Sequence, residues 1–202
     1  MHFLFIFHRK SHRTANLKQR NINMEKIIRH TKKWLEEVVI KHNFCPFAKK
    51  ELLRDSIHYQ AVESSDMEVG LQALAEEFFL LDQQEKIETT LVIFPNGFND
   101  FNDYLDLVEI ANALLEDQGY LGIYQLASFH PDYCFADSDN DDPANYTNRS
   151  PYPTLHIIRE KSLARAIKNH PDAEAIPDRN IAFARDIGLE KLQTDLDSIK
   201  NT

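Results

Sequence analysis

Short strand-like segments that alternate with helical segments constrain the fold of this chain more than any other feature. Residues 56–62, 89–94, 120–129 and 154–159 are rich in β-branched and aromatic residues, which is typical of strands. Residues at helical spacing fill the first two intervals between them. A strand–helix–strand unit crosses over right-handed and places its strands parallel. We therefore expect an α/β (α+β) fold, with about four strands in a mixed sheet that is covered by helices.

Residues that commonly cap helices predict where several helices begin and end. Ser65 and Glu68 have the spacing of a capping box. Asn99 or Asp100 can cap the following helix, and Gly119 suits the position after its last residue. The expected helices cover residues 24–41, 49–54, 99–118, 160–169, 177–188 and 189 onward, and one more follows Ser65 with a buried stripe from Met67 to Phe79.

The first 23 residues differ in composition from the rest, because they contain five Lys and Arg residues and no acid. We expect translation to start at Met24, with residues 1–23 an over-called or disordered N-terminal tail and residues 24–202 a single globular α/β domain. An organelle transit peptide is the alternative, since such leaders are rich in Arg and poor in acids.

Charge and composition limit the classes of partner. The net charge of −9 disfavours nucleic acid, because neutralising phosphates requires a basic surface. No apolar run approaches the roughly 20 residues that span a bilayer. The two cysteines, with no secretory signal, predict reduced thiols and a cytoplasmic location. No metal is expected, because residues 137–148 resemble a calcium loop but lack its glycine and its glutamate. The cofactor and the oligomeric state are left open.

The long polar connection over residues 130–153, between the third and fourth predicted strands, is the predicted site. It follows a strand end, and ligands of open α/β sheets bind beyond the carboxyl ends of strands. Connections of this length are usually functional or disordered. The candidate catalytic residues here are His130, Asp132 and His156, and the candidate ligand-binding residues are Asn148, Arg149, Ser150 and Arg159.

Each of these residues can have a functional role, for a chemical reason given below, or a purely structural role. His156 shares one face of its strand with Thr154 and Ile158, so it is half buried and its proton is sensitive to its surroundings. The alternative is a hydrogen-bonded core histidine. His130 is a candidate general base oriented by Asp132, or a turn residue bonded to the backbone. Arg149 can bind a carboxylate or phosphate group of a ligand through two hydrogen bonds. Its structural alternative is an ion pair with the aspartates of its own loop.

Cys45 is a further candidate catalytic residue. With Pro46 at the first helical position, Cys45 would cap a helix, and the helix dipole with Lys49 and Lys50 would lower the thiol pKa. The string over residues 44–48 is similar to the active-site string of omega-class glutathione transferases, and its Cys-Pro-Phe is similar to glutaredoxins. A strand leads into the cysteine of those families, whereas a helix does so here. A buried structural cysteine is the alternative.

From Met24 onward the chain resembles an uncharacterised, mostly bacterial family, domain of unknown function 1415. The resemblance rests on residues 43–48, 129–133 and 146–156, with a smaller match at residues 176–181. The resemblance places the chain in this family and implies no catalytic mechanism.

Three functions remain open at this point. The first is a small cytoplasmic enzyme that acts on an anionic small molecule by histidine acid–base chemistry, with Arg and Asn side chains as anchors. The second is a protein that binds or senses such a metabolite without turnover. The third is an acidic protein that binds a basic partner.

Overall fold

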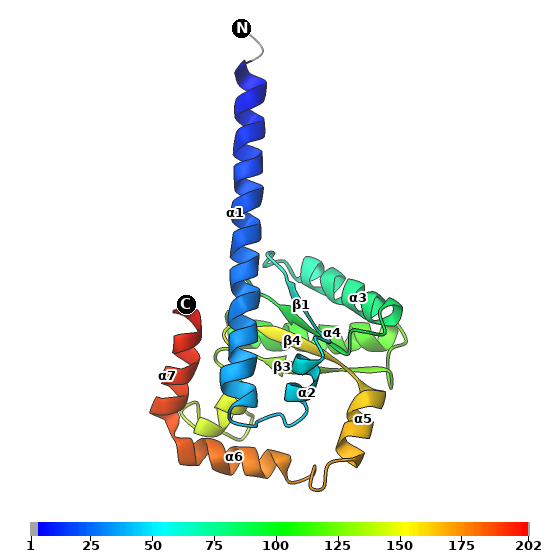
Figure 1. Cartoon of the computed structure of the whole chain (residues 1–202), viewed down its shortest axis with the longest axis vertical. Helices are drawn as coiled ribbons and strands as arrows, with labels where there is room; N and C mark the ends of the chain where they lie inside the picture. Colours follow the sequence, from blue (N-terminus) through cyan, green and yellow to red (C-terminus); the bar gives the residue numbers. More distant parts are fainter. Residues whose placement is uncertain (1–3, 202) are drawn as a thin grey trace.

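A four-stranded mixed sheet organises the fold (Figure 1). The computed structural model describes the backbone of residues 4–201 and the side chains of residues 19–201. The strands are β1 (Ile57–Ala61), β2 (Thr89–Ile93), β3 (Tyr124–Phe129) and β4 (Thr154–Arg159). Their order is β1-β2-β4-β3. β1 and β2 are parallel, whereas β4 is antiparallel to both of its neighbours. The mixed four-stranded sheet covered by helices is therefore confirmed, with β4 inserted between two strands that run in the same direction.

The predicted helices occur in the predicted order, and the structure adds the short helix η2 within the predicted long connection. They are α1 (Leu4–Trp34), the π-helix η1 (Leu35–Ile40), α2 (Ala48–Leu53), α3 (Met67–Gln83), α4 (Phe101–Asp117), the 3₁₀ helix η2 (Pro143–Thr147), α5 (Glu160–Lys168), α6 (Ile176–Ile187) and α7 (Leu189–Lys200).

Helix α1 begins well before the predicted start at Met24. Residues 4–34 contain no glycine or proline, so nothing in the sequence breaks the helix there. Its N-terminal part extends beyond the sheet (Figure 1). Among the described side chains, those of residues 19–23 are exposed, and Ile27 is the first that is buried. The proposed boundary at residue 24 stays a prediction.

The structure corrects the predicted cap of α3 and the predicted start of β3, and it selects one of the two predicted caps of α4. Asp66, and not Ser65, caps α3, and its carboxylate accepts a hydrogen bond from the backbone N–H of Val69 at 3.2 Å. Asp100 caps α4, as one of the two predicted alternatives. β3 starts at Tyr124 instead of residue 120, because residues 120–123 form a turn in which Gly122 has a φ of 79°.

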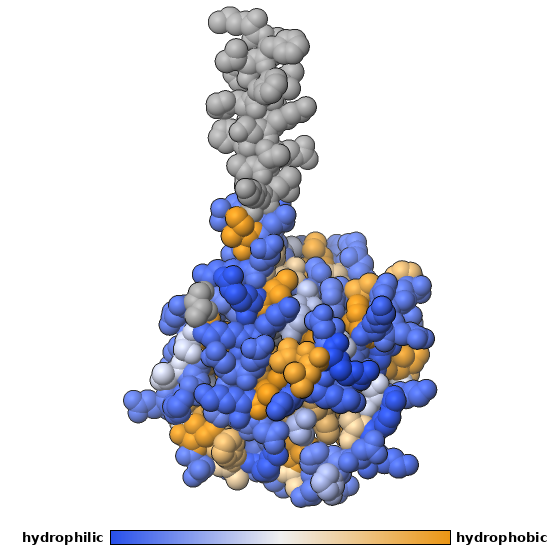
Figure 2. All heavy atoms as spheres, viewed as in Figure 1, coloured by the Kyte–Doolittle hydropathy of each residue, from blue (hydrophilic) through white to orange (hydrophobic). Residues whose placement is uncertain are grey.

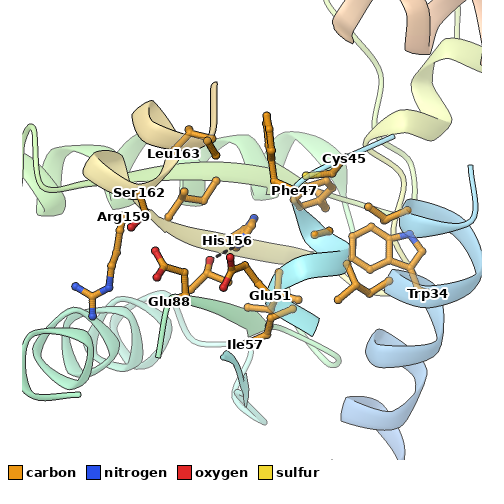
Figure 3. Close-up of a pocket in the computed structure, with 18 residues that line it drawn as sticks. Trp34, Cys45, Phe47, Glu51, Ile57, Glu88, His156, Arg159, Ser162 and Leu163 are labelled. Carbon is orange, nitrogen blue, oxygen red and sulfur yellow. Dashed lines mark hydrogen bonds between the residues drawn. The ribbon is translucent and has the colours of Figure 1, made fainter. Parts of the chain in front are cut away.

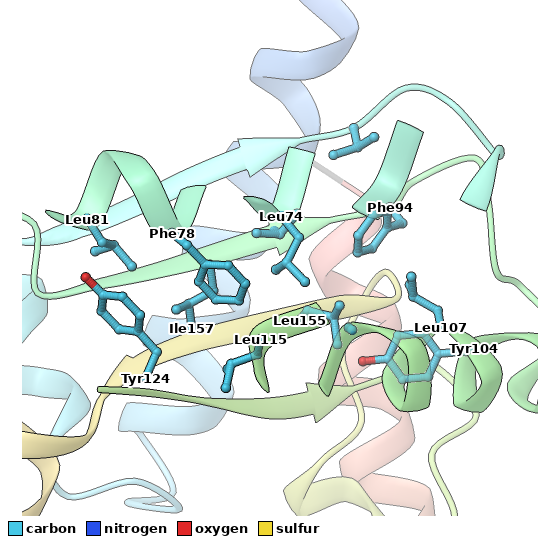
Figure 4. Packing of buried hydrophobic residues seen from close by; sticks show 13 residues of the cluster. Leu74, Phe78, Leu81, Phe94, Tyr104, Leu107, Leu115, Tyr124, Leu155 and Ile157 are labelled. Carbon is cyan, nitrogen blue, oxygen red and sulfur yellow. The ribbon is translucent and has the colours of Figure 1, made fainter. Parts of the chain in front are cut away.

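Each face of the sheet has its own helical cover. Helices α3 and α4 pack on one face, where Phe78 and Leu107 meet Leu155 and Ile157 of β4 (Figure 4). The strand register places His156 on the opposite face, as the alternation predicted. That second face packs against α1, η1, α2 and α5. On the surface shown in Figure 2, hydrophobic side chains gather over α2, where Leu53 is 77% exposed.

The connection between β3 and β4 is folded against the C-terminal helices. Its short helix η2 contacts α6 and α7, and Ala144, Asn145 and Tyr146 of η2 are buried. Arg185 of α6 forms an ion pair with Asp142 at 2.6 Å. The polar connection therefore uses much of its hydrogen-bonding capacity within the fold.

Candidate functional site

An apolar cavity of about 160 Å³ lies on the second face of the sheet (Figure 3). Residues of β2 and β4 line one side of it, and residues of η1, α2 and α5 line the others. Apolar side chains form most of the wall, among them Trp34, Leu35, Ile57, Leu91, Phe129 and Leu163. The polar lining residues are Cys45, Glu51, Glu88, Thr89, His156, Arg159 and Ser162. A largely apolar hollow with a few convergent polar groups is the usual form of a small-molecule site.

Trp34 forms a rigid apolar wall of this cavity. Its indole N–H donates to the backbone carbonyl of Arg149 at 3.0 Å. Its ring meets Phe129 edge-to-face, with the ring centroids 5.3 Å apart. Because the polar N–H is satisfied on the far side, the rest of the indole presents only apolar surface to the cavity.

His156 is the best-positioned polar group in the cavity. Its Nε2 lies 2.5 Å from the hydroxyl oxygen of Thr89, which lies 2.5 Å from the carbonyl oxygen of Ile157. A carbonyl has no proton, so the Thr89 hydroxyl must donate to it, and Nε2–H of His156 must then donate to Thr89. Nδ1 therefore carries the lone pair, and within the described part of the chain it has no hydrogen-bond partner.

Burial keeps this imidazole neutral. His156 is partly buried, because one side of its ring faces the cavity. Desolvation of the charged form lowers the pKa of His156 to about 4. At neutral pH the side chain is an uncharged hydrogen-bond acceptor.

Cys45 lines the same cavity, but the predicted activation of its thiol is wrong. Helix α2 begins at Ala48 with Phe47 as its N-cap, so Cys45 lies before the helix instead of capping it. The backbone N–H groups of Phe47 and Ala48 favour the thiolate, yet burial has the larger effect and raises the pKa of Cys45. Cys45 and Cys134 are both free.

Arg159 lines the cavity only with its aliphatic stem. Its guanidinium points away from the cavity, toward the end of α3 (Figure 3). It donates to the backbone carbonyls of Leu81 and Ile87 at 2.5 and 3.1 Å and to the hydroxyl of Tyr124 at 3.2 Å. The Arg159 cation is thus used to hold α3 and β2 to the end of β4.

His130 lies outside the cavity lining and matches its structural alternative. It is fully buried, its Nε2 donates to the carbonyl of Phe98 at 2.9 Å, and its Nδ1 accepts from the backbone N–H of Asp132 at 3.0 Å. Both nitrogens are occupied, and burial lowers the pKa of His130. The Asp132 side chain is exposed, so the expected Asp–His pair is instead a backbone contact.

The three predicted anchors of the loop also lie outside the cavity lining. Arg149 donates to the carbonyls of Tyr133 and Asn140 and stacks over the ring of Tyr146 at 4.6 Å. Asn148 and Ser150 donate to backbone carbonyls as well. His156 therefore lines the cavity without His130 and Arg149, although the sequence assigned all three to one site. Catalytic or binding roles for the individual residues stay predictions.

The structure adds site residues that the sequence did not single out, above all Glu51, Glu88, Thr89 and Leu163. Thr89 opens β2 and pairs with Ile158 of β4, which places its hydroxyl beside His156. The signal for Thr89 lies in the strand alternation, but it becomes readable only when the pairing of β2 with β4 is known. Leu163 and Ala166 have helical spacing in α5 and both line the cavity.

The described residues contain neither a metal-binding cluster nor a membrane-spanning helix. No group of three or more His, Cys, Asp and Glu side chains is arranged to hold a metal ion. None of the described helices is long and apolar enough to cross a membrane.

Comparison with known proteins groups the chain without naming a reaction. A family model described as a protein of unknown function (DUF1415) matches residues 26–194. No curated protein and no solved structure matches the chain.

Proposed function

Since the chain belongs to the DUF1415 family, whose description names no activity, its function has to be inferred from the cavity, and we propose that the protein binds a small, mainly apolar molecule there. The molecule lies against Trp34, Leu91 and Phe129, and it directs a hydrogen-bond donor at Nδ1 of His156. The observation that carries this proposal is a neutral imidazole nitrogen that has no hydrogen-bond partner among the described residues and faces a mainly apolar cavity.

The size of the cavity supports a ligand with one ring. An apolar cavity of about 150 Å³ accommodates a benzene-sized molecule, and this cavity has about 160 Å³. Nδ1 of His156 has no hydrogen-bond partner among the described residues, so a donor on the ligand gains a net hydrogen bond there. The two features together favour a molecule with an apolar body and one donating end.

The expected anionic ligand has less support. The guanidinium groups of Arg149 and Arg159 both donate to backbone carbonyls, so neither is free to pair with a carboxylate or a phosphate. The two carboxylates of the cavity, Glu51 and Glu88, would repel an anion.

An enzyme that uses Cys45 and His156 is the second candidate, because both side chains line the cavity. In such an enzyme Nδ1 of His156 would accept the thiol proton while Cys45 attacks the ligand. The raised pKa of Cys45 and the low pKa of His156 both oppose that proton transfer. Binding without turnover is therefore the better supported function.

Fluorescence of the single tryptophan, Trp34, provides a direct binding assay, because its ring lines the cavity. Toluene and phenol are the probes. We expect both to change the emission and phenol to bind about fivefold more tightly, since a neutral hydrogen bond contributes about 1 kcal/mol.

His156→Leu should remove the difference between phenol and toluene. His58→Leu is the matched control, because His58 lies on the face of the sheet opposite to the cavity. The proposal fails if neither probe binds, or if phenol keeps its advantage in the His156→Leu variant.

A further inference from the structure

The acceptors of the cavity outnumber its donors. Glu88 lines the cavity, and its Oε1 is buried without a hydrogen-bond partner among the described residues. Nδ1 of His156 is a second unpaired acceptor. Glu88 directly precedes Thr89, the residue that holds His156, and the side chains of Glu88 and His156 both line the cavity (Figure 3).

None of the cations near the cavity pairs with Glu88 among the described residues. Arg159 is the one cationic residue of the lining, and its guanidinium is turned toward backbone carbonyls. Lys50 and Arg54 approach Glu51, at 3.6 and 3.5 Å, and not Glu88. Within the described part of the chain, Glu88 has no ion pair.

Glu51 differs from Glu88 in having partners. Its Oε2 accepts a hydrogen bond from the Ser56 hydroxyl at 2.8 Å. Its charge is balanced by the two neighbouring cations of α2 and the turn that follows. Glu88 is therefore the carboxylate that is free to pair with a ligand.

We infer that the ligand of this cavity is a small apolar amine, whose ammonium group pairs with Glu88 and donates to Nδ1 of His156. An ammonium has three N–H donors and no acceptor, which matches two acceptors that have no donor. A carboxylate at the end of an apolar cavity attracts a cation strongly, because the surroundings screen the charge poorly. This inference rests on the proposed function and names its class of ligand.

Three probes of similar size separate the contribution of charge from that of shape: benzylamine, toluene and phenylacetate. We expect Trp34 fluorescence to show benzylamine binding at least tenfold more tightly than toluene, and phenylacetate binding at least tenfold more weakly than toluene. Glu88→Gln should bring the benzylamine-to-toluene affinity ratio close to one. Glu85→Gln is the matched control, since Glu85 is exposed in the same turn and should leave the ratio unchanged.

The outcomes distinguish this inference from the proposed function. If toluene binds but benzylamine has no advantage, or if Glu88→Gln retains the full advantage, the amine is overturned and the apolar cavity stands. If phenylacetate binds most tightly, the ligand is anionic and the inference is wrong. If none of the three probes binds, the proposed function fails together with the inference. A variant that still binds toluene is folded, so the ratio is readable in each protein.

Discussion

Acid should destabilise this protein through His156 in a way that can be isolated. In the folded protein the pKa of His156 is lowered from 6.5 to about 4, because burial disfavours the charged ring. The unfolded chain takes up a proton near pH 6.5, whereas the folded chain does so only near pH 4. Between these values the unfolded state binds more protons, so the free energy of unfolding falls as the pH falls.

The size of this effect follows from the two pKa values. At about 1.4 kcal/mol per pKa unit, the lowering corresponds to about 3 kcal/mol once the pH is below the folded value. At pH 5 about 2 kcal/mol of that stability should already be lost relative to pH 8. Such a loss is large beside the 5–15 kcal/mol that typically separates folded from unfolded domains.

Urea unfolding from pH 8 to pH 5, followed by circular dichroism, measures the effect. His156→Gln cannot take up the proton, so the wild type should lose about 2 kcal/mol more than this variant over the range. Burial also lowers the pKa of His42 and His130, but both are present in the two proteins and cancel in the comparison. His58→Gln is the matched control. Parallel curves for the wild type and His156→Gln would refute the buried, neutral state of His156.

Further predictions test the cavity, the thiol and the core. Ala166→Trp should fill the cavity and weaken toluene binding at least tenfold with an unchanged circular dichroism spectrum; unchanged binding would place the site elsewhere. Cys45 should react with a thiol reagent at pH 7 at least tenfold more slowly than a peptide cysteine, because burial raises its pKa. The rate is measured in the Cys134→Ala variant, in which Cys45 is the remaining cysteine. A rate faster than that of the peptide would favour the enzyme that uses Cys45 and His156. Tyr104→Phe should lower the free energy of unfolding by about 2–3 kcal/mol, measured in urea, because the buried hydroxyl bridges Thr154 and Phe129; a loss below about 0.5 kcal/mol would contradict that role.

The elements of the fold could be predicted because their signals are local. Asp100 and Gly119 mark the ends of α4, and the alternation along residues 154–159 identified the faces of β4 correctly. Local patterns failed where a neighbour competed. Ser64 accepts from the backbone of Asp66 and so favours Asp66 as the cap of α3.

The site could be predicted only in part. Cys45 and His156 were both expected to matter, and the structure places both in one cavity. The sequence favoured the polar connection over residues 130–153 because it holds many residue types that occur in active sites. Those side chains bond to backbone carbonyls and amides instead, which is how a long connection satisfies its polar groups when it packs against helices.

The sequence by itself determined most of the helices and strands, which face of β4 carries His156, and that the chain is acidic with few cysteines. Only the tertiary structure decided where the cavity lies, since its walls come from residues between 34 and 166. Insertion of β4 beside β2 brings Thr89 to His156, and η1, α2 and α5 complete the cavity that both residues line. Hydrogen-bond direction and burial set the proton on His156, and both depend on contacts between residues that are distant in the chain.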